Sequence, residues 1–128
     1  MGLYNLALSI DAYKVGFSMQ LLNGKQIVEL DNEGFLKKLS DWSEEIAIKI
    51  AQQENIQLTT AHWEIIELLR EFHRVYELSP SMRALVKRTE QLLGAEKGRS
   101  IYLLQLFPNS PAKLACKIAG LPKPQNCI

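Results

Sequence analysis

Two cysteines are the residues of this 128-residue chain whose type and spacing could carry chemistry. Cys116 and Cys127 are its only cysteines, and Cys127 is the penultimate residue. A thiolate can attack sulfane sulfur to give a persulfide, or another sulfur to give a disulfide. Between the two thiols, Gly120 is followed by Pro122 and Pro124, so a helix must end there and the chain must continue as an extended segment. The pattern predicts a reactive thiol on a C-terminal arm.

The charges near these thiols are predominantly positive. From Lys97 to the C-terminus the chain has basic residues but no acidic ones, so this part could attract an anionic partner such as RNA or could simply promote solubility. If Cys116 is helical, it lies on the flank of the helix, near Lys113 and Lys117 and beside three alanines: Ala112, Ala115 and Ala119. Two interpretations of Cys116 stay open: a reactive thiol whose pKa the lysines lower, or a half-buried cysteine that packs as a small apolar side chain.

A zinc site is a weaker interpretation of the cysteines. The two thiols have no companion pair and would need His62 or His73, which lie on a different predicted helix. We expect both histidines to be surface or core-edge residues, and we predict neither a metal nor a cofactor.

The length is sufficient for one domain that needs no disulfide or metal to fold. We find no signal peptide and no apolar run of about 18 residues, so we expect a cytoplasmic protein with no membrane contact. Residues 1–18 show no clear period. We expect them to be an extension of unknown role, with translation beginning at Met19 as one explanation and a short surface helix as another.

Capping residues and apolar spacing predict the elements after Met19. Asn23-Gly24 predicts a β-hairpin over 19–30 with a type I′ turn. The first predicted helix follows Asp31 or Asn32, the next follows Asp41, and the next begins at Thr59 or Thr60. Another begins near Pro80 and ends at Gly94, and a further helix covers 100–107. The last runs from about 111 to 119 with Gly120 as its cap. The fold class is therefore mainly α (α+β): a compact orthogonal bundle of five or six helices with an N-terminal β-hairpin, over 19–120, followed by a flexible arm over 121–128.

Several sequence motifs resemble those of a known family. The most specific is AGLPKP at 119–124, followed by the penultimate Cys127. The others are DNEGFL at 31–36, DW at 41–42, LTTAHWEII at 58–66, PSMR at 80–83, GAEKGRS at 94–100, YLLQLFP at 102–108 and PAKLACKI at 111–118. With these motifs, the chain resembles the DsrC/TusE family of sulfur-relay proteins from about Met19 onward.

The resemblance implies a compact helical fold with a mobile C-terminal arm and a sulfurtransferase-type role as a stoichiometric carrier. Cys127 would be the catalytic residue that carries a persulfide, and Cys116 would match a second cysteine, a resolving thiol, present in part of the family. The implied partners are sulfur-donor relay proteins and a downstream sulfur acceptor. The protein is expected to be monomeric, and any contact with tRNA is expected to be indirect.

Two branches of the family stay open. TusE-like proteins pass sulfur towards the enzyme that makes 2-thiouridine at the tRNA wobble position and generally need only the terminal cysteine. DsrC-like proteins use both cysteines, as a disulfide or trisulfide, with dissimilatory sulfite reductase. The presence of Cys116 favours the DsrC-like branch. By contrast, Ser110 replaces a usual glycine, and Gln125-Asn126 replaces the Thr-Gly that commonly precedes the last cysteine in DsrC-like proteins.

Two alternatives belong to other functional classes. The cysteines could form a thiol–disulfide redox switch that never carries transferable sulfur. Residues 43–72 could instead form a helix-turn-helix that reads DNA. Its second helix, however, would present three carboxylates beside two arginines, a poor surface for phosphate; these residues are Glu64, Glu67, Glu71, Arg70 and Arg74.

Overall fold

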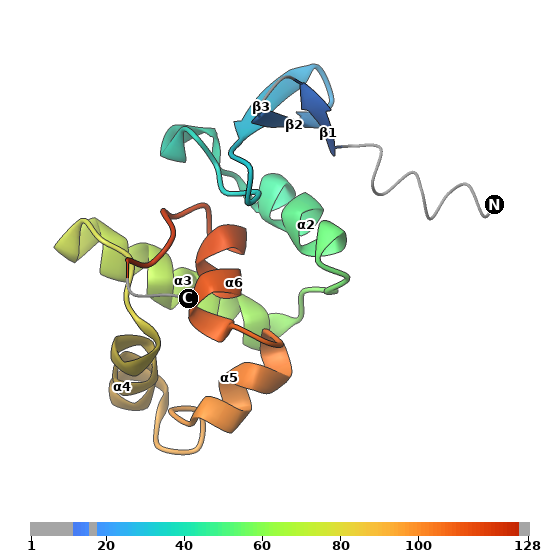
Figure 1. Cartoon of the computed structure of the whole chain (residues 1–128). Helices are drawn as coiled ribbons and strands as arrows, with labels where there is room; N and C mark the ends of the chain where they lie inside the picture. The colour runs from blue at the N-terminus through green and yellow to red at the C-terminus, as the bar shows by residue number, and fades with distance from the viewer. Residues whose placement is uncertain (1–11, 16–17, 126–128) are drawn as a thin grey trace.

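In the computed structural model, which describes residues 12–15 and 18–125, the chain opens with an antiparallel sheet (Figure 1). Its strands are β1 (Ala12–Val15), β2 (Ser18–Asn23) and β3 (Gln26–Leu30), in the order β1-β2-β3. Strand β1 lies within the segment 1–18 that we expected to be an extension, where no sequence period indicated a strand. The antiparallel pairing with β2 holds this segment as a strand, although its sequence shows no clear period.

The predicted hairpin is confirmed, but its turn is displaced by one residue. Asn23 pairs with Gln26, so Gly24 and Lys25 are the two loop residues. Gly24 has a φ of +62°, whereas Lys25 is not among the residues with positive φ. A type I′ turn needs positive φ at both loop positions, so the predicted turn type is wrong. Glycine at the first loop position is typical of a type II′ turn.

The short helix predicted after Asp31 or Asn32 is also wrong. The Asp31 carboxylate accepts hydrogen bonds from the backbone N–H groups of Glu33 (2.8 Å) and Phe35 (3.0 Å), which forms a local turn. Gly34 then has a φ of +91°, which no helix contains. The only helical structure in this segment is the 3-10 turn η1 (Leu39–Asp41).

Five α-helices follow, in agreement with the predicted fold class. They are α2 (Glu44–Gln53), α3 (Thr60–Tyr76), α4 (Met82–Leu93), α5 (Ser100–Leu106) and α6 (Pro111–Ile118). Two helices begin later than predicted because serine hydroxyls supply their caps. Ser43 caps α2 in place of Asp41, and Ser81 caps α4, so that Pro80 precedes the helix instead of lying in its first turn.

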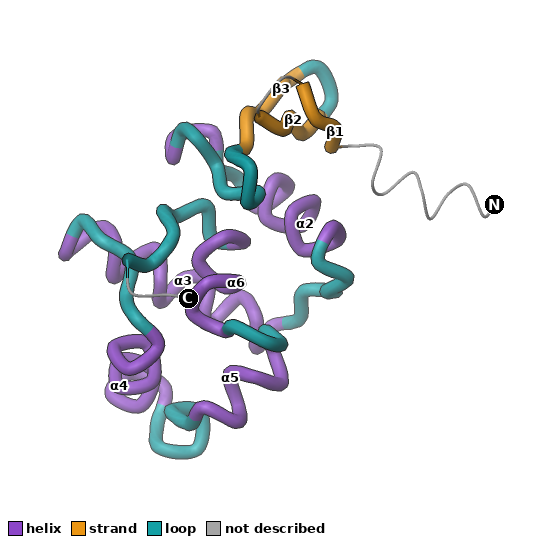
Figure 2. Tube along the Cα trace, viewed as in Figure 1, coloured by secondary structure: helices purple, strands orange, loops and turns teal. Residues whose placement is uncertain are grey.

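Helix α6 is the centre of the bundle. It contacts α2, α3, α4 and α5, and the sheet lies beyond α2 at one end of the molecule (Figures 1 and 2). The largest fully buried side chains come from most of the elements: Leu21, Leu30, Phe35, Ile46, Ile50, Ile65, Ile66, Leu69, Leu85, Leu103, Phe107 and Ile118. No helix in the described part of the chain is long and apolar enough to span a membrane.

His62 joins the start of α3 to the end of α5. Its Nδ1 accepts a hydrogen bond from the Thr59 backbone N–H (3.0 Å), and its Nε2 lies 2.8 Å from the Leu106 carbonyl oxygen. The imidazole is only 7% exposed and packs edge-on against Phe107. Both ring nitrogens are therefore engaged in structural hydrogen bonds, which leaves neither available to a metal. His73 is half-buried near the C-terminal end of α3.

Candidate functional site: the C-terminal arm and its root

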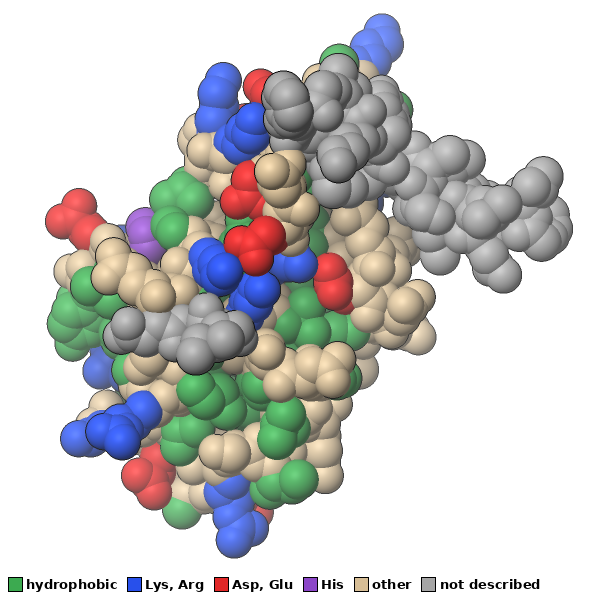
Figure 3. All heavy atoms as spheres, viewed as in Figure 1, with side chains coloured by type: hydrophobic (Ala, Val, Ile, Leu, Met, Phe, Trp, Pro, Cys, Tyr) green, Lys and Arg blue, Asp and Glu red, His purple; other side chains and the backbone are tan. Residues whose placement is uncertain are grey.

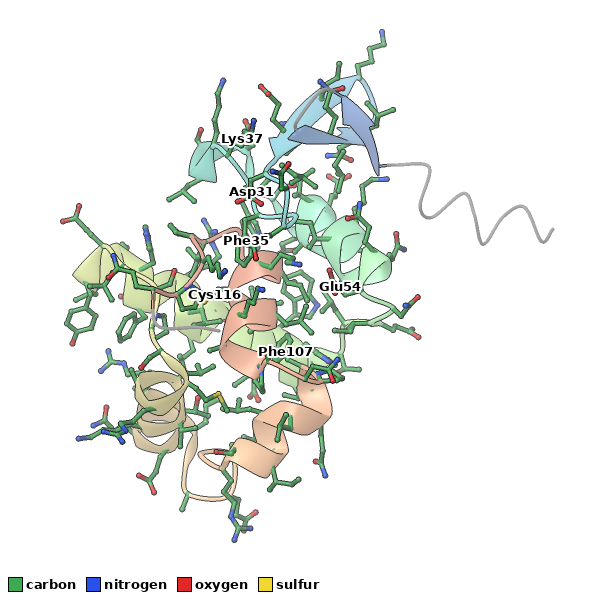
Figure 4. The ribbon with its side chains drawn as sticks, in the orientation of Figure 1. Asp31, Phe35, Lys37, Glu54, Phe107 and Cys116 are labelled. Carbon is green, nitrogen blue, oxygen red and sulfur yellow. The ribbon has the colours of Figure 1, made fainter. Side chains whose placement is uncertain are left out.

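Cys116 lies inside the bundle and not on an accessible flank. Its side chain has no exposed surface and lies in α6 among buried Ala112, Ala115 and Ala119 (Figure 4). Sequence geometry alone placed Cys116 on the flank of its helix, where half burial was one of the two interpretations. The difference arises because four helices surround α6 and cover the flank as well as the apolar face, while the alanines allow a close approach. Of the two earlier interpretations, the structure favours a packed cysteine.

The two lysines beside Cys116 in sequence bind carboxylates. Lys113 Nζ lies 3.2 Å from Glu33 Oε1, and Lys117 Nζ lies 3.1 Å from Glu54 Oε2. Figure 3 shows basic (blue) and acidic (red) side chains adjoining one another on the face in view. The excess of positive charge expected around Cys116 from the sequence is therefore largely neutralised by acidic residues from the first half of the chain.

Gly120 ends α6, as predicted, through a Schellman motif. Its φ is +74°, and its N–H donates to the Lys117 carbonyl (3.1 Å) while the Leu121 N–H donates to the Cys116 carbonyl (2.9 Å). A Cβ atom at Gly120 would lie 2.2 Å from Cδ1 of Trp42. Both the backbone conformation and the packing therefore require glycine here.

Two side chains that the sequence did not identify as functional complete the end of α6. Trp42 Nε1 donates to the Ile118 carbonyl (2.9 Å), and Arg70 Nη1 donates to the Ala119 carbonyl (2.7 Å). The Arg70 guanidinium lies 3.8 Å above the centre of the Trp42 ring. Burial lowers the pKa of Arg70. We call Trp42, Arg70 and Gly120 the arm root.

Sequence reasoning had little means of finding the arm root. Trp42 is 76 residues from its acceptor and Arg70 is 49 residues from its own, so no local pattern links them. The single hint was the Asp41-Trp42 pair within the family resemblance.

Residues 121–125 of the arm lie against the body. Leu121 and Pro124 are buried. The Ser79 hydroxyl donates to the Pro122 carbonyl (2.6 Å), and Lys123 Nζ lies 3.1 Å from both carboxylate oxygens of Glu33. Hydrogen bonds from Lys123, and then from Lys113, hold the pKa of Glu33 below its usual value.

A cavity of about 490 Å³ adjoins the arm where its described part ends. Its wall combines the α3–α4 connection with the arm: Phe72, Glu77, Leu78, Ser79, Pro80, Ser81, Ala84, Pro122, Lys123 and Gln125. Cys127 lies outside the described residues. A disulfide or trisulfide between Cys127 and Cys116 therefore stays a prediction.

Comparison with known proteins identifies the family that has this fold and this C-terminal arm. The family model described as "DsrC like protein" matches residues 22–128, and the chain belongs to this family. Among curated relatives, the sulfurtransferase TusE of Photorhabdus laumondii is 53% identical over 110 residues, which cover 86% of this chain and 98% of the relative. The sulfurtransferase TusE of Escherichia coli K12 is 50% identical over 110 residues, covering 86% of this chain and all of the relative.

Solved structures of DsrC proteins share the fold. Allochromatium vinosum DsrC has a TM-score of 0.80 and 43% identity, with 87% of this chain and 99% of that chain covered. The oxidized gamma-subunit of the dissimilatory sulfite reductase (DsrC) from Archaeoglobus fulgidus has a TM-score of 0.75 and 38% identity, with 85% and 99% covered. The predicted family, the mainly α fold class and the function of a sulfur-relay protein are confirmed.

Proposed function

We propose that the protein is a stoichiometric sulfur carrier whose reactive group is the Cys127 thiolate. The thiolate attacks the outer sulfur of a donor persulfide; a new S–S bond forms on Cys127, and the donor leaves as a thiolate. Attack by an acceptor thiolate on the outer sulfur then returns Cys127 to its thiolate form. The observation that carries the proposal is a penultimate cysteine on an arm with a fully capped root, in a chain of the DsrC-like family.

The more similar curated relatives favour the TusE-like branch. Identity to two TusE sulfurtransferases is 50% or more over almost their whole length, compared with 43% and 38% to the two DsrC structures. The complete burial of Cys116 also supports a mechanism that uses the terminal cysteine alone. We therefore propose that the carrier works in the cytoplasm, receiving sulfur from relay proteins and delivering it to a tRNA-thiolating enzyme, without direct contact with tRNA.

The second candidate is partnership with dissimilatory sulfite reductase. Two observations favour it: the presence of Cys116 and the likeness to a protein whose name describes it as the gamma-subunit of that reductase. In this branch both thiols would take part, and Cys116 would have to become accessible first.

The helix-turn-helix alternative is disfavoured by the packing of α3. The helix buries four apolar side chains and His62, and it contacts both α4 and α6. Arg70 donates to the Ala119 carbonyl at the arm root, and Arg74 pairs with Glu71, so both arginines already form contacts with other residues of this chain.

Replacement of the TusE sulfurtransferase in E. coli tests the proposed branch. In a strain that lacks its own TusE, this chain should restore 2-thiouridine in tRNA. Cys127→Ser should abolish the restoration and Cys116→Ser should retain it, with protein levels matched by immunoblot. If the wild-type chain accumulates normally but restores no 2-thiouridine, the tRNA branch is wrong. Tight binding to dissimilatory sulfite reductase that requires both cysteines would then support the second candidate.

A further inference from the structure

We infer that Trp42 and Arg70 are positioning residues for sulfur transfer, because they fix the direction in which the arm leaves α6. The inference rests on the proposed function, in which Cys127 at the end of this arm carries the sulfur. Neither side chain needs to touch the sulfur; both act through the backbone at the arm root.

The end of α6 has an unusually complete set of hydrogen bonds. The last carbonyl groups of a helix have no partner within it and usually depend on water or on a cap. Here each of the four has a donor, two from the backbone of the Schellman motif and two from distant side chains. The acceptor–donor pairs are Cys116 with Leu121, Lys117 with Gly120, Ile118 with Trp42, and Ala119 with Arg70.

The two side-chain donors support each other. The guanidinium of Arg70 stacks on the Trp42 ring, which in turn packs against Gly120. A planar group held by both stacking and a hydrogen bond has little rotational freedom. Its positive charge also lies at the C-terminal end of α6, where the helix dipole favours a cation. Three separate parts of the chain, the segment before α2, helix α3 and helix α6, thus meet at one backbone turn.

The other polar contacts of the arm are of a kind that a partner can displace. They include one hydroxyl hydrogen bond at Pro122 and an ion pair between Lys123 and Glu33, whose side chains are 37% and 44% exposed. A partner that draws Cys127 into its own site can break these contacts, while the arm root stays in place. The root therefore sets the position from which the arm reaches.

The length of the arm makes the direction at its root important. An extended arm of this kind, at ~3.3 Å per residue, can reach about 20 Å from Gly120 to Cys127, so a change of about 20° at the root moves its tip by roughly 7 Å. Transfer needs the two sulfur atoms within about 3.5 Å of each other. Loss of the root should therefore lower the rate of transfer to a protein partner more than it alters the thiol itself.

Amide hydrogen exchange tests whether the two side chains hold the root. Arg70→Leu and Trp42→Phe should each accelerate exchange at the Gly120 and Leu121 amides by about tenfold or more, the factor expected when a hydrogen bond to a charged or buried group is lost. Amides within α3 and α4 should change less than threefold. Arg74→Leu, one turn further along α3, is the matched control and should leave both arm-root amides unchanged, because Glu71, its ion-pair partner among the described residues, is not part of the arm root.

A functional measurement separates positioning from folding. In the E. coli replacement strain, Arg70→Leu should slow the accumulation of 2-thiouridine by about fivefold to tenfold at matched protein level. In the Cys116→Ser background, the rate of Cys127 alkylation by iodoacetamide should stay within twofold, since this reagent needs no partner. Arg70→Lys keeps a charged donor but loses the stacked plane, so its thiolation rate and its exchange should lie between those of Arg70→Leu and the wild type.

Two results would overturn the inference: unchanged exchange at Gly120 and Leu121 in Arg70→Leu and Trp42→Phe, or thiolation at the wild-type rate in a variant whose exchange has increased. Failure of the wild-type chain to restore 2-thiouridine would instead contradict the proposed function. In that case the exchange measurement still decides whether Arg70 and Trp42 fix the arm root.

Discussion

Gly120 shows how one residue couples the end of a helix to the start of a functional arm. Its positive φ allows the Schellman motif, and its missing side chain allows the Trp42 ring to lie against the backbone. The residue is therefore a fixed corner in the resting protein, although glycine at such a position suggests a free joint. Any movement that the proposed transfer requires must therefore arise beyond Gly120.

Replacing Gly120 by alanine should destabilise the protein by about 3 kcal/mol. About 1–2 kcal/mol comes from the left-handed backbone and a similar amount from the overlap with Trp42. Gly24→Ala is the control, since Gly24 has a similar φ of +62° but no atom within 4 Å of the added Cβ. It should cost only about 1 kcal/mol. Urea unfolding measures both, and equal losses would contradict the role of the Trp42 contact.

At the scale of single residues, the sequence indicated the candidate residues better than their surroundings. The two cysteines, the terminating Gly120 and the rigid prolines were recognisable because their chemistry is local. The complete burial of Cys116 and the pairing of Lys113 and Lys117 with glutamates depend on tertiary packing. Such packing brings together residues that lie far apart in the chain, which periodicity does not detect.

Glu33 is the acidic contact of the arm with the body, beside the buried Leu121 and Pro124; it receives hydrogen bonds from Lys123 on the arm and from Lys113 on α6. Glu33 lies in the turn that replaced a predicted helix. Because this segment forms a turn and not a helix, the Glu33 carboxylate lies within reach of Lys123 and Lys113.

Glu33→Gln should loosen the arm around Lys123, where the ion pair is lost. In this variant we expect the amide chemical shifts of Lys123 and Gln125 to move towards the values of an unstructured chain. In the wild type, raising the salt concentration from about 0.05 to 0.5 M should move these shifts in the same direction, because salt screens the ion pair. Glu29→Gln, at an exposed position of β3, is the control and should cause no shift in the arm. Unchanged arm resonances in Glu33→Gln would show that the ion pair does not hold it.

The same contact predicts a pH dependence. Because the pKa of Glu33 is lowered in the folded protein, the contact is fully present above the ordinary value of 4.5 and is lost as the pH falls through the lowered pKa. The Lys123 and Gln125 resonances should therefore be constant near neutral pH and should move only under acidic conditions. Movement between pH 6 and 8 would contradict the assignment.

For the whole molecule, the sequence predicted the fold class, the five longer helices and the family, because amphipathic helices and the AGLPKP motif carry strong local signals. Three features were beyond it: strand β1, the central position of α6, and the meeting of Trp42 with Arg70. All three depend on contacts between separate segments, which the pattern within any one segment does not encode.

The oligomeric state stays a prediction, and the surface agrees with a monomer. Most exposed large apolar side chains in the described part of the chain are distributed over several elements, among them Ile27, Ile48, Leu92 and Ile101, while Val75, Tyr76 and Leu78 lie together at the end of α3. Single apolar residues of this kind are ordinary on monomers. Light scattering after size exclusion, under reducing conditions, should give one species near 14.5 kDa, and a stable species of twice that mass would contradict the prediction.

Intact mass spectrometry tests most directly the central claim that Cys127 carries transferable sulfur. After incubation with sodium tetrasulfide and removal of the excess, the wild-type chain and Cys116→Ser should each gain about 32 Da, the mass of one sulfur atom, on Cys127. Cys127→Ser should gain nothing, and addition of a thiol acceptor should remove the added mass. If the wild type shows only the loss of two hydrogens, as in a Cys116–Cys127 disulfide, the protein is a redox switch and the carrier account is wrong.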